Sequence, residues 1–89
     1  MPQVAFTPAL ARYIESARVI ATGDTVGAVL ASVFRETPRL RGYVLDDQSR
    51  LRRHIAIFVN GALIAREGAL GTPIAPDDEV LVMQALSGG

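Results

Sequence analysis

The sequence contains no cysteine, and this absence removes three classes of site at once. Without thiols the chain cannot form a disulfide framework, a thiolate zinc site or a cysteine nucleophile. Net charge is also absent, because nine basic side chains balance nine acidic ones. A neutral chain lacks the positive footprint of a nucleic-acid binder. His54 is the only histidine, and one histidine without cysteine cannot assemble a histidine- or thiolate-rich metal site, so we expect no metal.

Long hydrophobic runs are missing as well. No apolar run approaches the roughly 18 residues that span a bilayer, and the start at Met1 has no basic region followed by an apolar stretch. We therefore expect a cytoplasmic protein that binds no membrane. The 89 residues are enough for one domain with a modest core, without a deep active-site cleft. No phosphate loop, carboxylate pair or nucleophile–base pair is apparent, so we expect a protein that is not an enzyme.

One helix has a clear signature. Asp24 or Thr25 is a suitable N-cap residue. After it, apolar residues recur at the spacing of a single helical stripe, and Pro38 ends the pattern. The stripe consists of Val26, Val29, Leu30, Val33 and Phe34. A short second helix is expected over residues 39–45.

Strands are predicted on both sides of this helix. Residues 4–6 and 18–21 precede it, and residues 55–59 follow it as the clearest strand. Asn60-Gly61 then predicts a hairpin, because both residues tolerate positive φ, and Leu63 and Ile64 begin the return strand. Residues 80–86 form the last strand. This order predicts an α+β fold, a β-grasp with a mixed sheet of about five strands and one main helix on one face.

The end of the chain carries the chemistry. Residues 1–86 are expected to form the single domain and residues 87–89 a flexible tail that ends in Gly88-Gly89. Glycine has no side chain and bends freely, so such a tail can enter a narrow enzyme channel. Ser87 is small as well. A carboxylate is a poor electrophile, but an enzyme can convert it with ATP to an acyl-adenylate, which can then accept sulfur and become a thiocarboxylate.

Three segments and the tail together resemble the MoaD/ThiS family of ubiquitin-like sulfur carriers. They are residues 23–30 at the start of the helix, residues 51–61 at the hairpin, and residues 76–80 before the last strand. Residues 6–10 are similar to the cysteine-forming branch of the family. The resemblance covers essentially the whole chain and implies a β-grasp fold.

The resemblance also implies a mechanism and partners. An E1-like adenylyltransferase or sulfurtransferase would use ATP to activate Gly89, which would carry sulfur as 1-thioglycine with no cofactor bound to the chain. A downstream acceptor enzyme would then make molybdopterin, the thiamine thiazole, cysteine or a specialised metabolite. The carrier is a co-substrate, or the small subunit of a complex such as molybdopterin synthase.

Strand alternation suggests where such partners would bind. Val80 and Val82 should share one face of the last strand, and Leu81 and Met83 the other. If the valines face the helix, Leu81 and Met83 lie on the open face of the sheet, where Phe58 would join them. Leu86, near the root of the tail, could anchor the tail against a partner. The alternative is that these side chains are simply core.

A short basic cluster is the second candidate surface. Arg50, Arg52 and Arg53 lie close together before the clearest strand, and Arg39 and Arg41 add two more charges. They form either an ordinary solvated loop or a docking patch for an acidic enzyme surface. Two other functions stay open: a ubiquitin-like modifier joined through Gly89 to lysines of targets, and a plain β-grasp interaction module.

Overall fold

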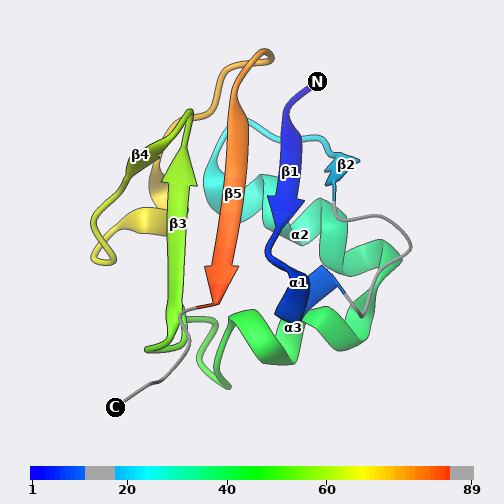
Figure 1. Cartoon of the computed structure of the whole chain (residues 1–89), viewed down its shortest axis with the longest axis vertical. Helices are drawn as coiled ribbons and strands as arrows, with labels where there is room; N and C mark the ends of the chain where they lie inside the picture. Colours follow the sequence, from blue (N-terminus) through cyan, green and yellow to red (C-terminus); the bar gives the residue numbers. More distant parts are fainter. Residues whose placement is uncertain (12–17, 85–89) are drawn as a thin grey trace.

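A computed structural model describes residues 1–11 and 18–84 of the chain (Figure 1). The elements follow in the order β1 (Gln3–Phe6), α1 (Pro8–Ala11), β2 (Arg18–Ile20), α2 (Val26–Glu36), α3 (Pro38–Val44), β3 (Ile55–Val59), β4 (Ala62–Leu63), the 3₁₀ turn η1 (Ala69–Gly71) and β5 (Glu79–Gln84). The predicted pattern of two strands, a main helix and further strands is confirmed. The predicted tail, residues 87–89, lies outside the described residues.

The strands form one mixed sheet in the order β2-β1-β5-β3-β4. β1 and β5 are parallel, with Val4 opposite Val80, whereas β2, β3 and β4 each pair with a neighbour in the antiparallel sense. In Figure 1 the strands lie in front and α2 crosses behind them. β5 thus occupies the centre of the sheet, held on both edges, and α2 covers one face. This is the β-grasp arrangement.

The core lies between the sheet and α2. Val80 and Val82 of β5 are fully buried, and so are Ile55 and Ile57 of β3. The helix contributes the predicted stripe, since its buried residues are Val26, Val29, Leu30, Val33 and Phe34. Both elements follow the periodicity of their backbone, two residues for the strands and about 3.6 for the helix. Val80 and Val82 thus share one face of β5, and the condition set for that strand, that its valines face the helix, holds.

The start of α2 is fixed by Thr25, one of the two N-cap residues expected. The hydroxyl oxygen of Thr25 accepts a hydrogen bond of 3.1 Å from the backbone N–H of Ala28, which satisfies a donor that the first helical turn leaves unpaired. The helix ends before Thr37, because Pro38 disfavours the helical conformation in the residue before it. Pro38 then begins α3, where a proline in the first turn costs no hydrogen bond.

The hairpin after β3 has the predicted turn. Asn60 and Gly61 both adopt positive φ, 51° and 85°, and Val59 pairs with Ala62 across the turn. The return strand β4 is only two residues long and begins one residue earlier than expected. α3 is also displaced by one residue, and β5 begins at Glu79. Element ends shift in this way because capping and turn geometry, rather than hydrophobic period, decide the last residue.

Candidate functional site

The root of the tail is held from both sides. Gln84, the last described residue, is opposite Ile55 in the antiparallel pairing of β5 with β3. On the other side its backbone N–H donates to the hydroxyl oxygen of Thr7 at 3.2 Å, and the N–H of Thr7 donates to the carbonyl of Val82 at 3.2 Å. Whatever follows Gln84 therefore leaves from a fixed point of the sheet. Leu86, Ser87, Gly88 and Gly89 lie outside the described residues.

The face of the sheet away from α2 carries an apolar row. Strand register aligns Ala5, Leu81, Phe58 and Leu63 as successive neighbours across β1, β5, β3 and β4. Met83 lies opposite Ala56 in the next row. We call these six residues the open sheet face. Five of the six are partly exposed, and Leu63 is 64% exposed.

The structure thus brings three predicted partner residues together, since Phe58, Leu81 and Met83 share this face. Their role in binding a partner stays a prediction. Sequence reasoning missed Leu63, although the Asn60-Gly61 turn contains the signal. A two-residue turn places Leu63 opposite Phe58, and side chains opposite each other in an antiparallel pair lie on the same face of the sheet.

A polar border lies at one side of this apolar face. Arg18 of β2 forms an ion pair with Glu79 of β5, across the intervening strand β1. The guanidinium of Arg18 also donates to the side-chain oxygen of Gln3 at 3.1 Å. Both side chains of the ion pair are about half exposed, so it contributes little to stability. It places two opposite charges beside the apolar row.

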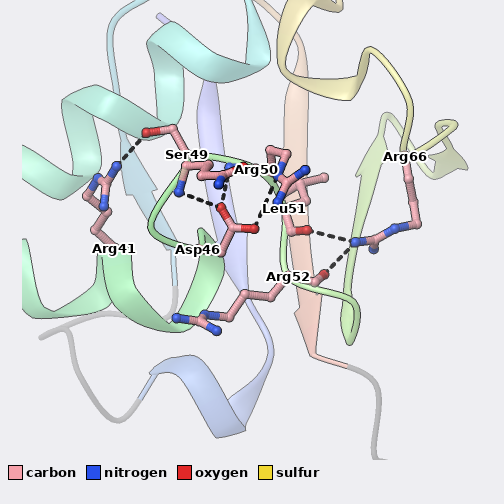
Figure 2. A network of polar contacts seen from close by, with 8 residues as sticks. Arg41, Asp46, Ser49, Arg50, Leu51, Arg52 and Arg66 are labelled. Atoms are coloured by element: carbon pink, nitrogen blue, oxygen red, sulfur yellow. Dashed lines mark hydrogen bonds and ion pairs between the residues drawn. The ribbon is translucent and has the colours of Figure 1, made fainter.

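The predicted basic cluster forms a hollow beside the start of β3 (Figure 2). The hollow has a volume of about 500 Å³ and is lined by Leu51 and by the side chains of Arg50, Arg52, Arg53, Arg66, His54 and Asp46. We call it the basic hollow. Arg66 was not part of the predicted cluster, because it lies beyond the hairpin and reaches back from the other side.

Two of these arginines are committed to holding the loop in place. The guanidinium of Arg66 donates to the carbonyl oxygens of Leu51 at 2.8 Å and of Arg52 at 2.7 Å, and also to that of Ile55. The Nε of Arg52 donates to the carbonyl of Gly42 in α3 at 2.7 Å. Figure 2 shows Arg66 reaching across to the segment that precedes β3. Both side chains therefore act as braces for this segment.

Asp46 is occupied within its own loop. Its Oδ1 accepts hydrogen bonds from the backbone N–H groups of Gln48 at 2.8 Å and Arg50 at 3.0 Å. The backbone hydrogen bond from Arg50 is the largest cause that lowers the pKa of Asp46 below its ordinary value. The Nε of Arg50 lies 3.4 Å from Oδ2 of the same carboxylate. Arg50 thus compensates most of the negative charge of Asp46.

Arg53 differs from its neighbours. It is exposed, and its side chain makes no hydrogen bond or ion pair with any residue in the ranges 1–11 and 18–84. His54 next to it is partly exposed and likewise has no such contact in those ranges. The structure therefore separates the two arginines singled out in the sequence. Arg52 supports the loop, and Arg53 remains available to a partner.

The described part of the chain contains no group of three or more histidine, cysteine, aspartate or glutamate side chains that could hold a metal ion. Asp77, Asp78 and Glu79 are adjacent in sequence, but the carboxylate of Asp78 already accepts two hydrogen bonds. One comes from the backbone N–H of Ala75 in its own turn, and the other from the side chain of Asn60 in the β3 hairpin. None of the described helices is long and apolar enough to cross a membrane.

The sheet topology and the apolar open face define a ubiquitin-like β-grasp protein, and the sequence places two glycines after its last strand. The chain belongs to the ThiS family, whose model matches residues 6–89.

Individual relatives agree with this assignment. Sulfur carrier protein CysO of Mycobacterium tuberculosis (strain ATCC 25618 / H37Rv) is 34% identical over 73 residues, covering 80% of this chain and 78% of CysO. The crystal structure of Mycobacterium tuberculosis CysO has a TM-score of 0.85 at 28% identity and covers 97% of this chain and 100% of that one. SAMP1 from Haloferax volcanii is 32% identical with a TM-score of 0.80, covering 99% of this chain and 98% of that one.

Proposed function

We propose that this chain is a sulfur carrier protein, a co-substrate that holds sulfur as a thiocarboxylate on Gly89. The observation that carries the proposal is its membership of the ThiS family, together with its 34% identity to a protein named as a sulfur carrier. The chain contributes no catalytic groups to this chemistry. It presents an acyl group, and its folded domain provides the surface by which enzymes recognise that group.

The chemistry needs two steps at one carboxyl group. The carboxylate of Gly89 attacks the α-phosphorus of ATP, and pyrophosphate leaves, so that an acyl-adenylate forms. A sulfide-level sulfur nucleophile then attacks the acyl carbon, and AMP leaves with the carbon–oxygen bonding pair. The product is 1-thioglycine at position 89. Both steps belong to an E1-like adenylyltransferase, and the use of ATP supports a cytoplasmic site of action.

The fold supports this role by separating the acyl group from the recognition surface. Gln84 is held between Thr7 and Ile55, so the root of the tail is joined to the same strands that carry the open sheet face. Ser87, Gly88 and Gly89 are small enough to follow a narrow channel. We propose that Phe58, Leu81 and Met83, with Leu86 at the root, bind the activating enzyme and then the acceptor enzyme in turn.

Alkylation combined with intact-mass measurement tests the proposal. The chain is isolated from cells of its source organism and treated with iodoacetamide. Because the sequence has no cysteine, a single alkylation reports the thiocarboxylate sulfur, and the unalkylated mass exceeds that of the carboxylate form by the difference between sulfur and oxygen. Deletion of Gly89 should abolish both signals. A wild-type chain that never gains sulfur, or a deletion variant that still does, contradicts the proposal.

A second function is favoured by one comparison. A second crystal structure of the Haloferax volcanii protein, there called small archaeal modifier protein 1, is 30% identical to this chain, with a TM-score of 0.79. The same activated Gly89 could form an isopeptide bond with a lysine of another protein. High-mass adducts of the tagged chain that resist thiols and depend on Gly89 would support this modifier function, whereas thiol-labile species alone would leave the carrier function.

A further inference from the structure

The basic hollow borders the point where the tail leaves the fold. Gln84 is opposite Ile55 in the sheet, and Arg53 and His54 directly precede Ile55 in the chain. Figure 1 shows β5 ending beside the start of β3. Any protein that contacts the root of the tail on this side therefore meets the side chains of the hollow.

The length of the tail limits how far the mouth of the enzyme channel can lie from Gln84. Five residues follow Gln84, and five extended residues span at most roughly 17 Å. An enzyme that brings Gly89 to its reacting atoms must therefore place the mouth of its channel within that distance of Gln84. The mouth then lies over the surface that surrounds the root, and the basic hollow is part of that surface.

The charge of the hollow indicates what this mouth must carry. Four arginines face one aspartate, and the carboxylate of Asp46 is already met by Arg50 and by two backbone N–H groups. Asp47 lies with Asp46 in the neighbouring hollow, and its charge reduces the excess of positive charge without cancelling it. The whole chain is neutral, so this excess of positive charge is local to the tail root.

The type of basic side chain in the hollow also indicates which anionic group the partner presents. The sequence contains no lysine, so every basic side chain is an arginine. The planar guanidinium matches a carboxylate with two parallel hydrogen bonds, whereas an ammonium acts as a point charge. Arg66 and Arg52 brace the segment before β3, which leaves Arg53, with His54 beside it, to meet an incoming group.

We propose that Arg53 and the basic hollow dock carboxylate side chains at the mouth of the enzyme channel that receives the tail. The receiving enzyme is thus one with an acidic rim around that channel. The inference rests on the proposed function, since it assumes that an enzyme takes up Gly89. Exposed ion pairs add little affinity, so the main effect of this docking is on the rate of productive encounter.

The test compares Arg53→Glu with Arg39→Glu as a matched control. Arg39 is exposed in the first turn of α3 and changes the net charge by the same amount, away from the hollow. Each purified chain is incubated with ATP in an extract of the source organism, and the rate of sulfur loading is followed by alkylation and intact mass. At low salt, Arg53→Glu should load about tenfold more slowly than wild type, because steering contributes factors of this size.

The salt dependence of loading distinguishes docking from a structural defect. The gap between Arg53→Glu and wild type should shrink at high salt, since the Debye length falls to about 3 Å at 1 M. Arg53→Gln should lie between them, which keeps the test valid if the glutamate variant fails to fold. The inference is overturned, while the proposed function stands, if wild type and Arg53→Glu load sulfur at equal rates. It is likewise overturned if Arg53→Glu and Arg39→Glu lose the same share of the loading rate. Absence of loading in wild type overturns the proposed function as well.

A defined peptide tests the chemistry of the site without any enzyme. Hexaglutamate is titrated into the isotope-labelled chain at low salt, with inorganic triphosphate titrated separately. The inference predicts that hexaglutamate shifts the Arg53 side-chain and His54 resonances, and that Arg53→Glu but not Arg39→Glu removes these shifts. Tighter binding of triphosphate than of hexaglutamate would mean that the hollow binds phosphate, which contradicts the proposed acidic rim.

Discussion

Asn60 and Asp78 hold the β3 hairpin against the start of β5 through their side chains. The Nδ2 of Asn60 donates to Oδ1 of Asp78 at 2.8 Å, and Oδ1 of Asn60 accepts from the backbone N–H of Glu79 at 2.9 Å. The Oδ2 of Asp78 accepts from the N–H of Ala75, also at 2.8 Å. One carboxylate thus closes the turn before the central strand, and its negative charge strengthens the hydrogen bonds that it accepts.

Stability should therefore depend on pH through Asp78. The backbone hydrogen bond from Ala75, followed by the side-chain bond from Asn60, lowers its pKa below the ordinary value. A folded-state pKa below the unfolded one gives a stabilising contribution that is present above the unfolded pKa of about 3.9 and is lost as pH falls through the folded pKa. Asp78→Asn should lower stability near neutral pH and reduce the loss of stability in acid.

Urea unfolding at about pH 7 and about pH 3 measures the stability near neutral pH and its loss in acid. The stabilising contribution of the Asp78 charge decreases between these two pH values as the carboxylate takes up a proton. Asp77→Asn is the control, since Asp77 is exposed on the same turn and its side chain makes no hydrogen bond within the described ranges. An Asp78→Asn chain that loses as much stability as wild type between the two pH values would contradict the assignment.

The hydrophobic pattern was sufficient to predict most of the architecture. The stripe from Val26 to Phe34 specified α2, and alternation separated Val82 from Leu81, because burial repeats with the period of the backbone. The site was predicted only in part. The contacts of Arg66 with the carbonyls of residues 51, 52 and 55 join segments more than ten residues apart, and long-range polar contacts leave no periodic signal in a sequence.

Gly23 should tolerate no side chain. Its φ is +144°, and a Cβ atom there would lie 2.6 Å from the backbone nitrogen of Val29. Gly23→Ala should cost about 1–3 kcal/mol, because both backbone strain and overpacking act at this position. Gly42 is the matched control, since a Cβ there meets nothing within 4 Å. Gly42→Ala should stabilise α3 by up to about 1 kcal/mol.

Thermal or urea unfolding of the two glycine variants measures these opposite signs. If Gly23→Ala is as stable as wild type, the turn before α2 adopts another conformation in solution.

Two leucines on opposite faces of the sheet should respond very differently to truncation. Leu30 is fully buried under the sheet, whereas Leu63 on the open sheet face is 64% exposed. Leu30→Ala should cost about 2–5 kcal/mol, the transfer and cavity cost of a buried leucine. Leu63→Ala should change stability by no more than about 0.5 kcal/mol. Similar losses in the two variants, measured by urea unfolding, would mean that the open sheet face is covered in the isolated chain.

Thr7 should control how firmly the root of the tail is held. Thr7→Val keeps the shape of the side chain but removes the hydroxyl oxygen that accepts from the N–H of Gln84. The backbone bond from Thr7 to Val82 remains. Loss of one such bond costs about 1 kcal/mol, so the Gln84 amide should exchange about fivefold faster with solvent.

Amide hydrogen exchange followed by NMR tests this local effect. The control is Thr22→Val, which removes a hydroxyl that bonds Ser32 and not β5. It should leave Gln84 exchange unchanged while altering global stability by a similar amount. Because a frayed root moves the point at which the chain leaves the sheet back from Gln84, it lowers the effective concentration of Gly89 at a fixed channel. Thr7→Val should therefore also load sulfur more slowly than the control. Unchanged exchange at Gln84 would show that Ile55 and the β3 pairing hold the root without Thr7.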